Sequence, residues 1–452
     1  MAERKIAAWL FVCSLVGGQA SAQNWSFDAR QVALGSPGSG ENLASHMIDE
    51  ESTYRAIVLP FGLFQVFSDF DKLNPTKDDF DVVRTMEYAA SPLHYTFGRD
   101  SATNTRNSAS GLNSFVTDIR NAQLSRDLNR YRGAAPANQP RAEGLASPNW
   151  GKTIRISDGS RGAFHGVYVG AGPYLAMQTD VKFDQQLIDL LGSPTDVYAP
   201  NAQMHLATAT RGQMAMAITG GYRGRYALPS SSTDRDGVYL AANYNYLRGF
   251  RYEEVNFALR LDTDTTGLVT ILPSLGSPLV VTRDNATSGT GRAIDVGVGL
   301  VMDRWETGFG VNGIANRITW TNVERTSYSL SNPFLGDSDF AESLAQPMGD
   351  VAVTLPVDYR GNVGYRADRW SAVAEAGRGY GGTSFHSGYE YRFNVLAVRG
   401  GGMYSRQLWN PSGGVGVNLG PRVALDVAMY GNAANVERKR RPAIAVSLRF
   451  NH

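Results

Sequence analysis

The 452-residue chain has little of three things that often classify a protein: cysteine, net charge and long apolar runs. Its single cysteine, Cys13, lies in the leader described below, so disulfides and thiol chemistry are excluded from the rest of the chain. Lys and Arg number 43 against 42 Asp and Glu, and 41 against 41 without residues 1–22, so no net charge remains to attract nucleic acid. Beyond residue 22, no run of about 18 apolar residues occurs, which excludes a transmembrane helix.

Motifs for enzyme, metal or cofactor chemistry are also missing. The six histidines show no metal-ligand spacing, and neither HExxH nor GxSxG occurs. Residues 308–313 match GxGxxG, but they lie in an alternating β region without a following helix, so a dinucleotide loop is not expected. The acidic stretch 69–81 lacks the spacing of a calcium loop. We therefore predict a protein that is not an enzyme and needs neither metal nor cofactor.

The first 22 residues have the three parts of a secretory signal peptide. Arg4 and Lys5 precede the apolar run 6–16, and the small residues Ala20, Ser21 and Ala22 follow it. The apolar run is shorter than the roughly 20 residues that an anchor needs. We expect residues 1–22 to be removed and the exported chain to begin at Gln23.

Alternation with a period of two dominates the rest of the sequence. In residues 443–450 (AIAVSLRF), every second side chain is large and apolar, and residues 422–430 and 294–302 repeat the pattern. Counting from residue 163 to 450 predicts about fourteen strands, and 16 if two more precede them. Outside the strands, residues 184–191 show helical spacing, and residues 327–350 form a long polar loop.

The charged side chains of these strands lie opposite the large apolar ones. A barrel with lipid outside and water inside needs this arrangement, because Arg or Lys facing the mid-bilayer costs about 2–4 kcal/mol. We predict an all-β fold, an antiparallel transmembrane β-barrel over residues 151–452. A soluble β-sandwich or propeller remains the alternative, because its strands also alternate. The candidate lumen-facing polar residues are Arg260, Asp295, Arg392, Arg399 and Asp426.

The N-terminal region, residues 23–150, lacks a sustained period, and we predict that it plugs the lumen. Its stretch 54–67 is nearly all apolar, but Pro60 and Gly62 argue against a regular central strand. Residues 112–131 show helical spacing, and residues 134–148 form a Pro-rich and Ala-rich loop. Arg399 and Asp426 are expected to help fix the plug. The candidates for plug packing or ligand contact are Phe61, Leu63, Phe64 and Phe67.

The last quarter of the chain also carries a family resemblance. The segments HSGYEYR (386–392), LAVRGG (396–401), GGVG (413–416) and LDVAMYG (425–431) resemble the C-terminal strands of the PorV/TraF-like branch of FadL-type outer-membrane barrels. Residues 28–35 (DARQVALG) look like the segment that opens such mature chains. Two features depart from the family: the usual Asn-Pro-Ala-Gly stretch is absent, and the chain ends in Phe450, Asn451 and His452 instead of on the aromatic residue.

This resemblance implies a fourteen-stranded barrel with an N-terminal plug that binds or passes hydrophobic small molecules such as fatty acids or lipids. We therefore expect the protein in the outer membrane of a Gram-negative-type bacterium, in contact with outer-membrane lipid and without a nucleic-acid partner. The alternative is a non-transporting barrel that serves as a scaffold or secretion partner for exported proteins, which would use the loop 327–350.

Overall fold

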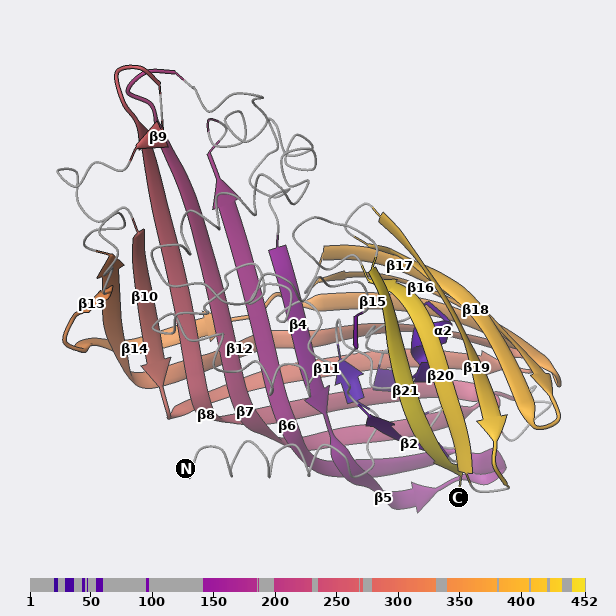
Figure 1. Cartoon of the computed structure of the whole chain (residues 1–452). Coiled ribbons are helices and arrows are strands. Elements are labelled where there is room, and N and C mark those ends of the chain that lie inside the picture. The colour runs from indigo at the N-terminus through magenta and orange to yellow at the C-terminus, as the bar shows by residue number, and fades with distance from the viewer. Residues whose placement is uncertain are drawn as a thin grey trace.

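Antiparallel β-strands make up nearly all of the described chain in the computed structural model (Figure 1), which confirms the predicted all-β class. None of the helices in the described residues is long and apolar enough to cross a membrane. The structure describes residues 20–22, 29–35, 43–44, 47, 54–59, 95–96, 141–184, 186, 199–229, 235–267, 269–270, 279–330, 340–379, 382–405, 408–420, 423–432 and 441–451.

The elements follow one another along the chain as strands joined by turns and longer connections. In order they are β1 (Ala20–Ala22), α2 (Ala29–Ala33), β2 (Tyr54–Leu59), β3 (Tyr95–Thr96), β4 (Arg141–Pro148), β5 (Trp150–Asp158), the 3₁₀ turn η4 (Ser160–Gly162), β6 (Phe164–Phe183), β7 (Gln203–Ala227), β8 (Gly237–Thr263), β9 (Val269–Thr270), β10 (Leu279–Ala286), β11 (Gly289–Met302), β12 (Trp305–Leu330), β13 (Phe340–Glu342), β14 (Gln346–Thr354), β15 (Asp358–Arg366), β16 (Trp370–Gly379), β17 (Gly382–Phe393), β18 (Leu396–Ser405), β19 (Leu408–Asn418), β20 (Val423–Asn432) and β21 (Arg441–Asn451).

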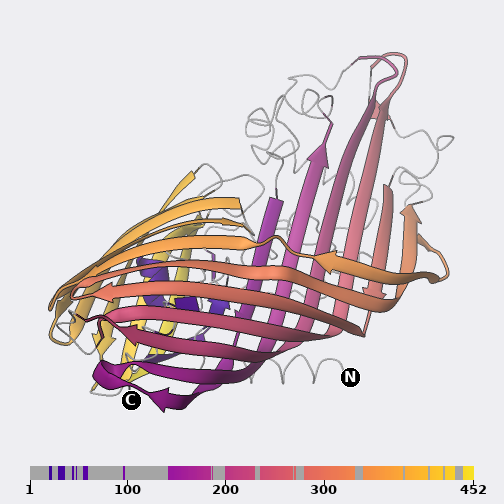
Figure 2. The ribbon, with the colours of Figure 1, turned by 180° about the vertical axis from the view of Figure 1, so that it is seen from behind.

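Fourteen of these strands pair in one continuous row, which we call the wall. Its order is β5, β6, β7, β8, β11, β12, β15, β16, β17, β18, β19, β20, β21, β2. The wall curves like part of a barrel around α2 (Figures 1 and 2). No register between described residues joins β5 to β2 at the two ends of the row.

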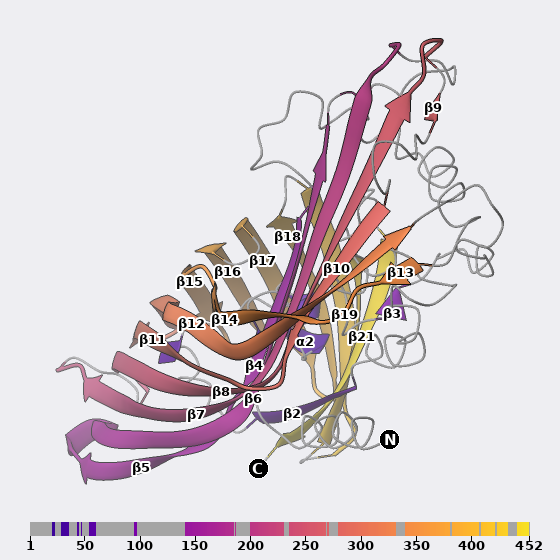
Figure 3. The ribbon, with the colours of Figure 1, turned by 90° about the vertical axis from the view of Figure 1, so that its left-hand side faces the viewer.

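Four strands run on past the wall into a second region, which we call the extension. Strands β6, β7, β8 and β12 contain 20, 25, 27 and 26 residues, whereas crossing a bilayer takes about 9–11. Beyond a bend, their far parts pair with β4, β10 and β14 in the order β4, β6, β7, β8, β10, β12, β14. Figure 3 shows these long strands rising away from the wall.

The bend is packed around Trp320, which is fully buried. Its ring stacks on Tyr252 with 5.5 Å between centroids, and its Nε1 donates to Gln213 Oε1 at 3.1 Å. A Cβ at Gly249 would lie 2.5 Å from the indole, and one at Gly289 would lie 2.8 Å from it. The two strands can pass this ring only because both positions are glycine.

Ion pairs hold the strands of the extension together. Arg325 makes two bonds to Asp284, of 2.6 and 2.7 Å, between β12 and β10. Arg211 Nε and Tyr252 Oη both donate to Glu254 Oε2 at 2.6 Å. Burial acts to raise the pKa of Glu254, but these hydrogen bonds outweigh it and hold the pKa below its usual value.

The two faces of the wall have opposite polarity. On the outer face, Val298, Phe309 and Met429 are between 41% and 56% exposed. On the inner face, Glu375 and Asp426 are 4% and 0% exposed. This distribution is the reverse of a soluble sandwich, which buries its aliphatic side chains and exposes its charges.

Several sequence-based boundaries were wrong because period-two patterns do not reveal where paired strands bend or end. The expected loop 134–148 contains β4, Arg141–Pro148, which pairs with β6. The expected polar loop 327–350 contains the end of β12, all of β13 and the start of β14.

The N-terminal region also differs from the prediction. Tyr54–Leu59, expected in the plug, forms β2 and pairs with the outer edge of β21, which would otherwise lack a neighbour on that side along residues 446–451. A short helix, α2, lies where irregular chain was expected. The helix expected at 112–131 lies outside the described residues, and so does most of the one at 184–191.

Candidate functional site

The N-terminal segment contacts the inner face of the wall at two separate places. Helix α2 packs against β18, β19, β20 and β21. Farther along, Ala44 and Met47 are buried in a cluster with Tyr239 and Ala241 of β8 and with other wall residues. A Cβ at Gly297 of β11 would lie 2.7 Å from the Ala44 nitrogen. The described residues of the N-terminal segment therefore contact two separate parts of the wall's inner face.

Helix α2 is a single turn whose two ends are fixed by the wall. The Ala29 N–H donates to Ser447 Oγ at 3.1 Å, which satisfies one of the free donors at the helix start. Ser412 Oγ donates to the Ala33 carbonyl at 3.2 Å near the other end. The chain then turns at Gly35, whose φ of +81° is readily adopted only by glycine.

A flat surface of glycines receives this turn. A Cβ at Gly388 would lie 2.6 Å from Leu34 Cα, and a Cβ at Gly401 would lie 2.7 Å from the Gly35 nitrogen. A Cβ at Gly414 would lie 2.7 Å from Ala33 Cβ. These separations are well below a normal carbon contact of about 3.5–4.0 Å. We call Gly388, Gly401 and Gly414 the glycine surface, because α2 reaches the sheet only where side chains are missing.

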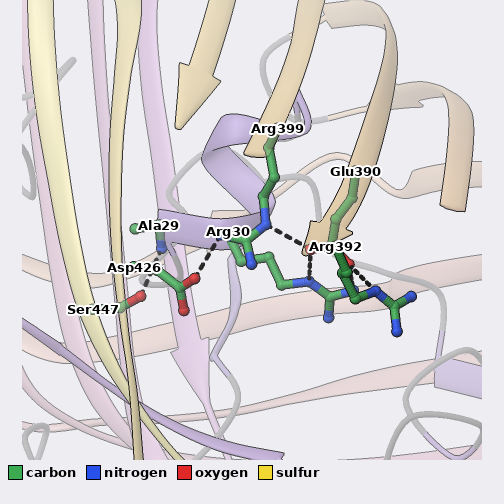
Figure 4. A network of polar contacts seen from close by, with 7 residues as sticks. All are labelled: Ala29, Arg30, Glu390, Arg392, Arg399, Asp426 and Ser447. Atoms are coloured by element: carbon green, nitrogen blue, oxygen red, sulfur yellow. Dashed lines mark hydrogen bonds and ion pairs between the residues drawn. The ribbon is translucent and has the colours of Figure 1, made fainter. Parts of the chain in front are cut away.

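An ion network beside the glycine surface ties α2 to three strands (Figure 4). Arg30 of α2 bonds both oxygens of Glu390 at 3.0 and 3.3 Å. Arg399 Nε reaches Glu390 Oε2 at 2.6 Å, and Arg399 Nη1 reaches Asp426 at 2.5 Å. Glu390, Arg399 and Asp426 are nearly inaccessible to solvent, so Arg30 supplies charge from the plug to a buried carboxylate of the wall.

Two further polar networks line the inner face. On β15, β16 and β17, Arg360 bonds Asp358 at 2.6 Å and Glu375 at 2.7 Å. His386 Nε2 lies 2.9 Å from the same Glu375 oxygen. On β8 and β11, Asn245 donates to Asp295 at 2.7 Å. Both signs of charge occur together on β15, β16 and β17, so this part of the inner face is internally neutralised and is not a channel lining of one sign.

The structure brings three of the five candidate lumen residues together. Arg392 and Arg399 both contact Glu390, and Arg399 links it to Asp426. Asp295 belongs to the separate network on β11, where the Gly313 N–H also donates to it at 2.8 Å. Arg260 lies in the extension, paired with Asp262 at 3.0 Å. The plug candidates Phe61, Leu63, Phe64 and Phe67 lie outside the described residues.

Three residues of the site did not emerge as candidates from the sequence: Arg30, Glu390 and Ser447. Glu390 stood on the predicted inner face, but the pattern gave no reason to choose it above other charges. Arg30 lies in the opening segment that resembles a family, and this was the signal that could have identified it. Within the described residues, no cluster of three or more His, Cys, Asp or Glu side chains could hold a metal ion.

Comparisons with known proteins give only distant likenesses. No family profile and no curated protein matches the chain. Among solved structures, the Ralstonia pickettii toluene transporter TbuX aligns at 11% identity with a TM-score of 0.33, covering 71% of this chain and 93% of that chain. The Pseudomonas putida toluene transporter TodX aligns at 12% identity with a TM-score of 0.31, covering 72% and 93%.

A triple mutant of the Rhodopseudomonas blastica porin aligns at 9% identity with a TM-score of 0.24, covering 69% of this chain and 100% of that chain. Scores at this level do not establish a shared fold, so the description of the sheet rests on its own registers. The resemblance to FadL-type barrels and to their PorV/TraF-like branch stays a prediction.

Proposed function

We propose that the chain is an outer-membrane β-barrel that binds or passes hydrophobic small molecules of the fatty-acid or lipid class. The observation that carries the membrane assignment is the polarity of the wall: large apolar side chains face outward, whereas paired charges face inward. Only a closed barrel or helices can satisfy the backbone inside a bilayer, and the wall has the strand number of a barrel. The signal-peptide-like leader supports export to that membrane.

The inner site supports a barrel whose lumen is partly filled. Helix α2 and the residues Ala44 and Met47 contact the inner face at two places, so a solute must pass between or around them. The apolar stretch 54–67 follows directly in the sequence, and its aromatic side chains are the proposed contacts for a hydrophobic ligand. A plug of this kind favours a selective binding path over an open aqueous pore.

The test is the lipid content of the purified protein. The full chain, expressed in a Gram-negative host and purified in mild detergent, should retain extractable fatty acid or lipid, and Phe64→Asp should reduce that amount at least about tenfold, a difference of about 1.4 kcal/mol. Phe80→Asp, in the acidic stretch that was not assigned to the ligand, is the control. Equal lipid content in both variants and the parent would reject the binding proposal while leaving the barrel intact.

The extension supports a second candidate, a scaffold or secretion partner for exported proteins. Strands of 25 to 27 residues project well past the length needed for the bilayer and offer a surface to a protein in the aqueous phase. Deleting residues 331–339 between β12 and β13 would then abolish co-purification of exported proteins without changing lipid content. The lipid-binding candidate predicts loss of lipid from Phe64→Asp. The scaffold candidate predicts loss of co-purifying exported proteins from the deletion variant.

A further inference from the structure

Three exposed arginines stand together at the edge of the apolar outer face. Arg248 of β8, Arg292 of β11 and Arg317 of β12 are all exposed. Along β11, the outward positions 302, 300, 298, 296 and 294 are apolar, and Arg292 is the next in that series. Along β8, Tyr244 and Tyr246 are exposed and Arg248 follows them. We call the three residues the arginine row.

The strand registers bring these arginines within reach of one another. Arg292 lies directly opposite Arg317, which places their Cβ atoms about 4.5–5.5 Å apart. Arg292 lies opposite Tyr246 on its other side, so Arg248 is its diagonal neighbour, at about 7–8 Å. The remaining partners in register are neutral: Met216 and Thr290 beside Arg248, and Thr354 beside Arg317.

Nothing in the described part of the chain neutralises this row. None of the three guanidinium groups has a hydrogen bond or ion pair to another described residue, whereas the buried arginines 360 and 399 each contact two carboxylates. Like charges directly opposite each other destabilise a sheet. Two opposed arginines that no described residue neutralises therefore call for a compensating anion.

The position of the row indicates where that anion comes from. Apolar wall lies on one side of it and the extension on the other, so it sits where a bilayer gives way to water. There an outward arginine costs far less than it does at the middle of the bilayer. Strand β6 ends and β7 begins on the row's side of the wall, where the long connection 184–202 joins them, and outer-membrane barrels carry their longer loops on the extracellular side. The row accordingly faces the outer leaflet.

We propose that Arg292 and Arg317, flanked by Arg248, bind the phosphate groups of a phosphorylated glycolipid of the outer leaflet. This inference rests on the proposed membrane location. Guanidinium groups form paired, charge-assisted hydrogen bonds with phosphate oxygens, and two facing forks suit a group that carries more than one charge. The exposed rings of Tyr244 and Tyr246 lie next to the row on the lipid side, where acyl chains would contact them.

The experiment uses the full exported chain in zwitterionic detergent and fluorescent bisphosphorylated lipid A as the probe. The double variant Arg292→Gln/Arg317→Gln should bind at least about tenfold more weakly than the parent, a difference of about 1.4 kcal/mol. The control is Arg378→Gln, because Arg378 of β16 is also exposed at this end of the wall but lies opposite Tyr359 and not another arginine. That variant should change affinity less than about twofold, and dephosphorylated lipid A should bind the parent as weakly as lipid A binds the double variant.

Thermal unfolding supplies a second readout with a distinctive sign. In detergent without anionic lipid, Arg292→Gln should unfold at the same or a higher temperature than the parent, because it removes repulsion. Added lipid A should raise the unfolding temperature of the parent by more than that of the variant. A lower unfolding temperature for Arg292→Gln without lipid would contradict the unpaired state of the row.

Other outcomes overturn the proposal. Equal lipid A affinity in the parent and the double variant would reject the site, and displacement of lipid A by inorganic phosphate at comparable concentrations would show a free-anion site and no lipid site. Failure of the membrane assignment is recognised separately: the protein would then fractionate with the soluble periplasm and migrate identically in gels with and without boiling.

Discussion

Adding one methyl group to the glycine surface should loosen α2, and the chain contains its own control at the adjacent residue. A Cβ at Gly401 would lie 2.5 Å from the Leu34 carbonyl carbon, whereas a Cβ at Gly400 meets nothing within 4 Å. Reaching a normal contact of about 3.5 Å requires α2 to withdraw by about 1 Å. Gly401→Ala should therefore displace the helix, and Gly400→Ala should leave it in place.

The size of the effect follows from overpacking, which costs about 1–3 kcal/mol in a well-packed site. That energy corresponds to about a 5-fold to 150-fold rise in the population of molecules whose α2 is released from the wall. The assay is trypsin cleavage after Arg30 in detergent, quantified by mass spectrometry, because a docked helix whose Arg30 is bonded to Glu390 resists the protease. When α2 detaches and rebinds faster than trypsin cleaves, the cleavage rate reports the population with α2 detached.

Cleavage of Gly401→Ala should accelerate by that factor, whereas Gly400→Ala should match the parent. Both variants add the same methyl group to the same strand, so a general loss of β18 stability would accelerate cleavage equally in the two. Equal rates in both variants would refute the docking of α2 against the glycine surface.

Three further changes test the ion networks and the bend. Arg399→Met should destabilise the protein by about 3–5 kcal/mol, because the buried carboxylate of Asp426 loses the guanidinium charge that contacts it, and Arg399→Met/Asp426→Leu should recover most of this loss in a urea titration. Trp320→Ala should cost about 3–5 kcal/mol and make the extension susceptible to protease while the wall stays resistant. Because the pKa of Glu254 is lowered in the fold, its stabilising contribution is present above its ordinary value of 4.5 and is lost as the pH falls below it. Glu254→Gln should therefore flatten the acid side of the unfolding temperature against pH, and an unchanged profile would contradict the bonds from Arg211 and Tyr252.

Period-two alternation was enough to predict most wall strands. In β11 and β21, the apolar positions 294 to 302 and 444 to 450 form unbroken series, and both strands were placed within a few residues of their bounds. The full length of the long strands could not be predicted, because their pattern shifts at the bend. In β8, the register with β7 passes from Gly249 to Arg251 and leaves Phe250 unpaired. The large apolar side chains therefore stand at even positions before the bend and at odd positions after it, which is the pattern of two separate strands.

The docking site was less predictable, because its partners depend on registers and on distant segments. Arg399 and Asp426 were placed on the inner face by alternation, but their contact requires two intervening strand registers and the small Gly416 between them. Arg30 and Glu390 are 360 positions apart, and no local pattern joins them. Pro60 and Gly62 argued against a regular strand in the stretch 54–67, yet β2 occupies Tyr54–Leu59 within it.

The central claim is that the outer face of the wall meets lipid and the inner face does not. The direct measurement uses single-cysteine variants on a Cys13→Ser background, with a fluorophore attached at neighbouring residues of β8 after reconstitution into liposomes. Tyr244→Cys, on the exposed apolar face, should be quenched by a lipid-bound nitroxide, whereas Asn243→Cys, on the buried polar face, should not. Equal quenching at the two positions, or quenching of both by a water-soluble agent only, would contradict a membrane-embedded wall.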